Sequence, residues 1–229
     1  MPVVDLAQTS RRELNSRLHA LTLDTNETLW QIDNPGGQHA LAVGVDAPIT
    51  IQIRGHVGYY CGGMNKEAVV VVEGNAGVGV GENMMSGMVH VKGDASQSAG
   101  ATAHGGLLVI DGNASARCGI SMKGINIVVK GSIGPMSAFM AQSGALVVLG
   151  DAGDALGDSI YEAKLYVRGE VKSLGADCVE KSLDEEHRIE LRALLDAAGL
   201  NGEVKVEEFK RYGSGRTLYN FHVDNAGAY

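Results

Sequence analysis

The chain has 229 residues, of which 45% are apolar and 32 are glycine, about twice the usual glycine share of roughly 7%. A net charge of −8 and only 5% aromatic residues argue against nucleic-acid binding, which favours basic patches and stacking side chains. With no apolar run near the roughly 18 residues of a membrane span, no signal-peptide pattern at Met1–Asp5 and an odd count of three cysteines, we expect a cytoplasmic protein without a disulfide framework.

Residues 1–48 are predicted to form an N-terminal helix and capping segment. Ser10-Arg11-Arg12-Glu13 has the pattern of a capping box, which starts a helix. Leucines then recur at helical spacing, at Leu14, Leu18 and Leu21. Residues 28–48 favour a strand and a loop, with a turn at Asn34-Pro35-Gly36-Gly37.

Residues 49–178 contain a repeat of 19 residues. It is marked by seven glycines, called anchor glycines below: Gly55, Gly74, Gly93, Gly112, Gly131, Gly150 and Gly169. The residue two before each anchor is β-branched, the residue four before is aliphatic, and the residue directly before is charged in six of seven repeats. This alternation, stopped by glycine, predicts a short half-buried strand.

Two further columns of the repeat predict turns. Seven residues after the anchors only glycine or alanine occurs, which indicates tight corners: Gly62, Gly81, Gly100, Gly119, Ala138, Gly157 and Ala176. One residue after the anchors, turn-forming side chains dominate: Asn75, Asp94, Asn113, Ser132 and Asp151.

One strand per repeat cannot bury its own apolar face, so the repeats must stack. We therefore predict an all-β fold, a right-handed single-stranded parallel β-helix of seven turns with short helical flanks. At a strand spacing of about 4.8 Å the seven turns would form a rod about 34 Å long.

Outward-pointing strand positions, three and five before each anchor, are unexpectedly apolar. They read Val69 and Val71, Met88 and His90, Leu107 and Val109, Asn126 and Val128, Ala145 and Val147. An apolar stripe of this size indicates either an interface with a partner or a surface covered by a helix of the same chain. Both interpretations can hold on different turns.

Residues 179–229 are predicted to form a C-terminal helix and tail. Ser182-Leu183-Asp184-Glu185 has the pattern of a second capping box, and Gly199 and Gly202 mark the end of the helix. Its apolar face carries Leu191, Leu194, Leu195 and Ala198. The tail Phe209–Phe221 is aromatic and basic. Both flanks are expected to cover the open ends of the rod.

Side chains that could act in catalysis, bind a nucleotide or hold a metal ion do not combine into a recognisable site. Gly77–Gly81 lacks the helix that a dinucleotide loop requires. Cys61 and Cys118 share a column three turns apart, about 14 Å, too far for a disulfide or a common zinc ion. His56, His90 and His104 fall at three different repeat positions, and His19, His39, His187 and His222 lie on the flanks. We expect no catalytic, cofactor-binding or metal-ligating residue.

An acidic cluster could suggest calcium. It consists of Asp151, Asp154 and Asp158. Aspartates in glycine-rich turns more often bond nearby backbone than a cation, so we interpret these three as turn formers.

Several stretches resemble the GXGXG domain that ends the large chain of glutamate synthases. They are Val70–Gly77 with Gly81, His56–Cys61, Glu82–Gly87, Ser137–Met140, Gly157–Glu162 and Leu218–His222. The resemblance covers nearly the whole chain and is strongest to the free-standing GXGXG subunit of N-methylglutamate synthases. It implies a β-helix without catalytic residues of its own.

The resemblance also implies a hetero-oligomeric enzyme complex. One partner would resemble a class II glutamine amidotransferase, and the other the FMN-binding part of glutamate synthase with an iron–sulfur cluster. Together they would convert methylamine and L-glutamate into N-methyl-L-glutamate and ammonia. The alternatives are the GXGXG-containing subunit of a formylmethanofuran dehydrogenase or of a formyltransferase/hydrolase-type complex, the GXGXG subunit of a split glutamate synthase, or a stand-alone binding solenoid.

Overall fold

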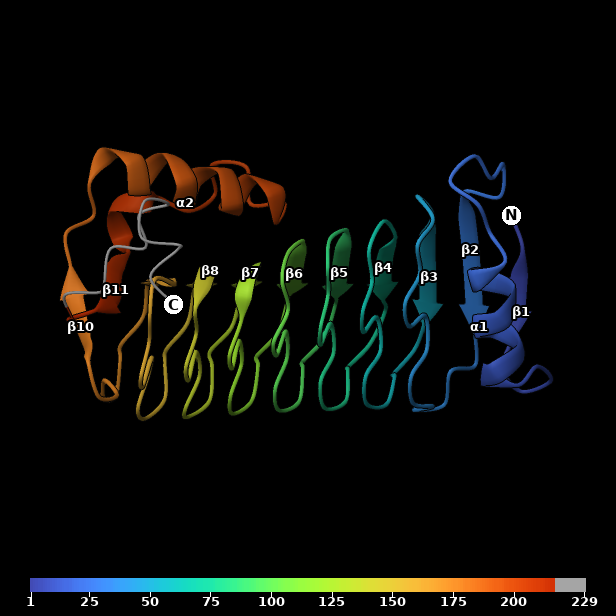
Figure 1. The fold of residues 1–229 in the computed structure, drawn as a ribbon, viewed down its shortest axis with the longest axis horizontal. Helices are drawn as coiled ribbons and strands as arrows, with labels where there is room; N and C mark the ends of the chain where they lie inside the picture. Colours follow the sequence, from blue (N-terminus) through green and yellow to red (C-terminus); the bar gives the residue numbers. More distant parts are fainter. Residues whose placement is uncertain (217–229) are drawn as a thin grey trace, which may run out of the picture.

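The protein is a parallel β-solenoid, seen here in a computed structural model that describes residues 1–216. Within this range eleven strands form one sheet in the order β1 to β9, then β11 and β10, and there are two short α-helices. Figure 1 shows strands β3–β8 side by side along the long axis, each joined to the next by a loop that closes one turn. The predicted fold class is confirmed.

The repeat strands match the predicted register. They are β3 (Thr50–Arg54), β4 (Val69–Val72), β5 (Met88–Val91), β6 (Leu107–Ile110), β7 (Lys123–Val129), β8 (Ser143–Val148) and β9 (Lys164–Val167). All are parallel, and residues 19 apart face each other, as Val70 faces Val89. One irregularity interrupts this register, between Lys123 and Asn126. Aliphatic side chains two and four before the anchors are buried in one continuous core.

A second ladder runs beside the strands, two residues after the anchors. It is a row of single parallel bridges through Val57, Ala76, Ala95, Ala114, Ile133, Ala152 and Val171. Each turn is therefore bonded to the next on two sides. Two-sided bonding resists bending of the stack.

At the N-terminal end, β1 (Val3–Asp5) and β2 (Leu29–Asp33) extend the sheet. Leu29 of β2 pairs in parallel with Thr50, so the stack continues for one longer turn before residue 49. The predicted capping box forms, since Ser10 Oγ accepts a hydrogen bond from the Glu13 amide at 3.2 Å. Helix α1 (Arg11–His19) buries Leu14 and Leu18 and closes this end of the core.

At the C-terminal end, β11 (Lys210–Ser214) pairs antiparallel with both β9 and β10 (Cys178–Lys181). Helix α2 (Glu185–Ala197) and the 3-10 turn η1 (Val206–Glu208) lie between β10 and β11 in the sequence. The predicted capping box at Ser182 is wrong. Asp184 is the N-cap, and Ser182 Oγ instead donates to the Asp184 carboxylate at 3.1 Å, so the helix begins two residues later.

Candidate interaction surface

A ladder of side chains beside the anchor glycines locks successive turns together. The side chain one residue after an anchor accepts a hydrogen bond from the backbone amide one turn later. The rungs are Asn75 N to His56 Nδ1 (2.9 Å), Asp94 N to Asn75 Oδ1 (3.0 Å), Asn113 N to Asp94 Oδ1 (2.7 Å), Ser132 N to Asn113 Oδ1 (2.9 Å), Asp151 N to Ser132 Oγ (2.9 Å) and Glu170 N to Asp151 Oδ1 (2.8 Å). The predicted turn-forming side chains therefore make a continuous series of hydrogen bonds from one turn of the solenoid to the next.

From Gly74 on, the anchors must be glycine because the preceding turn leaves no room for a Cβ atom. A Cβ on Gly112 would lie 2.4 Å from Asp94 Oδ1 and 2.9 Å from the Gly93 carbonyl carbon. The predicted corners are also confirmed: Gly100 has φ +67°, and Ala138 adopts the same left-handed region at φ +56°. In the last turn the left-handed residue is Asp177 rather than Ala176.

The C-terminal part of the apolar stripe is covered by α2. Val109, Val128 and Val147 are fully buried, in one cluster with Leu191, Leu194 and Leu195 of the helix. Figure 1 shows α2 alongside the β6–β9 end of the rod. For these turns the interpretation as a partner interface is wrong, because the chain covers its own strands.

A polar clasp fastens α2 to β9. Glu190 accepts hydrogen bonds from Lys164 Nζ at 2.7 Å and from the Tyr166 hydroxyl at 2.5 Å. Burial opposes ionisation of Glu190, but these two donors outweigh it and hold the pKa below its ordinary value. Burial, together with the Glu190 carboxylate, raises the pKa of Tyr166. The sequence analysis did not identify this clasp. Tyr166 was the available signal, because valine is the commonest residue at its position in the repeat, three before the anchor.

The N-terminal part of the stripe has no helix over it in the described structure. Val69, Val71, Met88 and His90 are half-buried, next to Gln52 on β3. We call the outward face of β3, β4 and β5 the open face. It is the part of the predicted stripe that remains accessible to a partner.

A charged group borders the open face at its junction with the covered part. Asp111 contacts His90 Nε2 at 2.9 Å, Lys130 Nζ at 2.8 Å and Lys92 Nζ at 3.5 Å. Burial raises the pKa of Asp111, but the hydrogen bonds from Lys130 and His90 prevail and leave it below its ordinary value. The carboxylate is thus engaged by three neighbours and serves to fix the strand ends.

The three cysteines are buried, and two histidines of the repeat are held in hydrogen bonds. Cys61 and Cys118 are free and fully buried, and burial raises the pKa of each thiol to about 12. Cys178 is likewise buried, with its pKa raised by burial to about 11. His56 belongs to the anchor ladder and His90 to the Asp111 group, so the structure does not bring them together.

The aspartates of the predicted turns have individual partners. Asp151 takes part in the ladder, Asp154 forms an ion pair with Lys172 at 2.7 Å, and Asp158 accepts from Ser159 Oγ at 2.8 Å. Over residues 1–216, His, Cys, Asp and Glu side chains nowhere gather in threes that could hold a metal ion.

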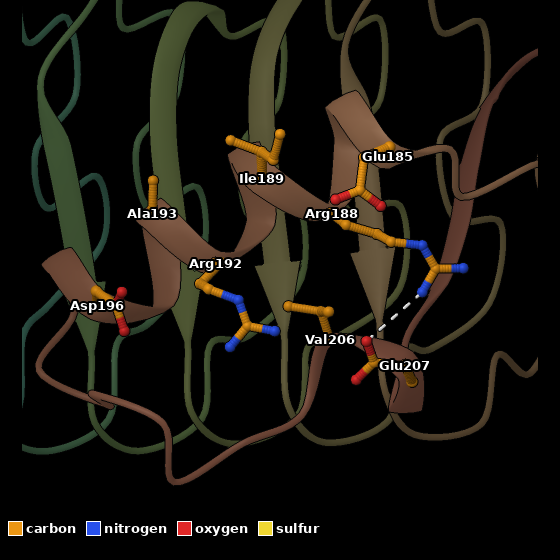
Figure 2. Close-up of a pocket in the computed structure, with 8 residues that line it drawn as sticks. All are labelled: Glu185, Arg188, Ile189, Arg192, Ala193, Asp196, Val206 and Glu207. Atoms are coloured by element: carbon orange, nitrogen blue, oxygen red, sulfur yellow. Dashed lines mark ion pairs between the residues drawn. The ribbon is translucent and has the colours of Figure 1, made fainter.

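A shallow groove lies on the outer side of α2, with a volume of about 340 Å³. Figure 2 shows its lining residues, with Arg188 reaching Glu207 of η1 at 3.7 Å. Ile189, on the outer side of the helix, is 64% exposed. Five of its eight lining residues are charged, but the groove is shallow and Arg188 and Glu207 pair with each other, so we assign it no chemistry.

Comparison with known proteins gives one informative relative. No family model matches the chain. It is 63% identical over 229 residues to Protein GlxC of Rhizobium meliloti (strain 1021), and the match covers both chains completely. Among the described helices, none combines the length and apolar character needed to cross a membrane. At this level of identity over the full length, the chain belongs to the same family as Protein GlxC.

Proposed function

We propose that this chain is a structural, non-catalytic GXGXG subunit of an N-methylglutamate synthase complex. The observation that carries the proposal is the division of the apolar stripe: α2 covers one half as far as Met88, and Val69 and Val71 in the other half have no helix over them within residues 1–216. The resemblance of the repeat to the GXGXG domain of glutamate synthases indicates which proteins these would be. A coarser form of the proposal is a glutamate synthase-associated subunit.

The physical role follows from rigidity. Turns bonded on two sides and pinned by the anchor ladder lose little conformational entropy when a partner binds. Two catalytic subunits held on such a rod keep a fixed distance and orientation. An amine released at one active site can then reach the next without escaping, which is an advantage of proximity.

The partners in this proposal are a class II amidotransferase-like subunit and an FMN-binding subunit with an iron–sulfur cluster. Both cofactors would reside in the second partner, because this chain supplies neither a phosphate loop nor a cysteine cluster within residues 1–216. The net reaction would be methylamine plus L-glutamate to N-methyl-L-glutamate plus ammonia.

Reconstitution tests the proposal. The chain would be purified alone and combined with the two candidate partner subunits, and N-methylglutamate formation would be measured by mass spectrometry. We expect activity only when this chain is present, and a colourless preparation when it is purified by itself. Full activity of the two partners without it would refute the scaffold role. Stoichiometric flavin in the isolated chain would refute its non-catalytic character.

A further inference from the structure

The open face continues the surface that α2 occupies. Val71 pairs with His90, which pairs with Val109, so Val71 lies in the column that α2 covers further along the rod. The cluster under α2 includes Leu107 and Met88 only as partly buried members. At β5 the apolar interface of α2 therefore continues through Met88, while His90 beside it is paired with Asp111.

The chain's other helix is engaged elsewhere. Helix α1 buries Leu14 and Leu18 against the first turn. Its Asn15 side chain donates to the Ala40 carbonyl at 2.8 Å and accepts from the Ala42 amide at 3.0 Å. Within residues 1–216 no further helix remains to cover the open face.

Helix α2 shows which chemistry this face accepts. It presents apolar side chains at helical spacing to the outward valines, and it places a carboxylate, Glu190, against a basic group at the strand, Lys164. Its 13 residues span about 20 Å and cover four strands about 4.8 Å apart. The open face, three strands wide, has room for a helix of about three turns on the same scale.

We infer that the open face binds an amphipathic helix of a partner protein, about three turns long, which continues the line of α2 across β5, β4 and β3. This rests on the proposed function and specifies the docking element of one partner. Arg54, Glu73 and Lys92 at the strand ends are exposed and alternate in charge, and Arg54 would face a carboxylate on that helix, as Arg168 faces Glu208 of η1 at 3.7 Å. Such pairs select the orientation of the helix more than they add affinity.

Site-specific photo-cross-linking tests the inference in the assembled complex. A benzophenone amino acid would replace Thr50, Val71 or Met88 in turn, and cross-linked peptides would be identified by mass spectrometry. We expect the three positions to reach one partner segment at residues three or four apart, the spacing of a helix face. The control position is Val78, which follows β4 in the sequence and is 48% exposed, but does not belong to the outward face of a strand. It should not reach that segment.

Affinity gives a second readout. Val71→Asp should weaken the complex roughly tenfold or more, because an unpaired carboxylate would be buried against the partner. Val78→Asp should change it by less than about twofold. Cross-links at alternating residues, to a second copy, to this chain's own residues, or to nothing would each overturn the inference.

The same experiment separates the inference from the proposed function. If the amidotransferase-like and FMN-binding subunits co-purify but cross-link elsewhere, the function stands and the helix does not. If the cross-linked helix belongs to an identified protein of another class, the helix stands and the function does not. If Val71→Asp binds as tightly as the unaltered chain, the open face is not the docking site.

Discussion

Substitution of Val128 by aspartate should release α2 from the rod without unwinding the solenoid. Val128 is fully buried beneath the helix, in a cluster separate from the inner core. Losing the burial of a valine costs about 1.5–3 kcal/mol. An unpaired carboxylate under the helix adds several kcal/mol more, and the sum of about 5 kcal/mol or more rivals the low end of a whole domain's stability, about 5–15 kcal/mol. Lifting the helix off avoids this cost, because the inner core stays closed.

Hydrogen–deuterium exchange of the α2 amides, followed by mass spectrometry, measures this release. A loss of about 5 kcal/mol corresponds to faster exchange by roughly three orders of magnitude or more. Val71→Asp is the matched control, since it lies in the same column but is only half-buried, and it should change stability by less than about 1 kcal/mol. Unchanged α2 exchange in Val128→Asp would refute the covering role of α2. Global unfolding would refute the independence of the two clusters.

Three further outcomes are expected from single properties of the fold. Gly112→Ala should lower the thermal midpoint by roughly 4–10 °C because its Cβ meets Asp94 Oδ1 at 2.4 Å, whereas Gly213→Ala, with nearest atoms at 3.8 Å, should be near neutral in the same melting experiment. The folded-state pKa of Glu190 lies below its ordinary 4.5, so the hydrogen bonds of Glu190 stabilise the packing of α2 fully above about pH 4.5. This stabilisation is lost as the pH falls through the folded-state pKa. Acid should therefore speed hydrogen exchange in α2 less in Glu190→Gln than in the unaltered chain. With a thiol pKa of about 12, Cys61 and Cys118 should resist iodoacetamide at pH 8 until the chain is denatured, and rapid labelling of the native protein would contradict their burial.

The period of the sequence was enough to predict the solenoid, its strands and its corners. From Gly74 on, each anchor glycine lies against the anchor one turn before it, and the inward aliphatic residues form one continuous core, so the period of the sequence carries the necessary information. The ladder residues Asn75, Asp94 and Asn113 could be identified as turn formers for the same reason. Their bond to the next turn was not predicted, because it depends on how the turns are offset.

The sequence could not show which part of the apolar stripe is covered by the chain's own helix. Val71 and Val109 occupy equivalent positions in the repeat, yet one is half-buried and the other lies under α2. The difference comes from where the C-terminal helix folds back, which depends on the β9–β11–β10 pairing at the far end. Non-repeating segments carry no internal copy from which such a contact can be inferred.

Purification of the complex through a tag on this chain, with mass spectrometry of the bound chains, tests the central claim most directly. The account predicts an amidotransferase-like subunit and an FMN-binding subunit bound to the rod, with all flavin and iron in the partner. Amidohydrolase and formyltransferase chains in their place, or a rod that purifies only with copies of itself, would contradict it.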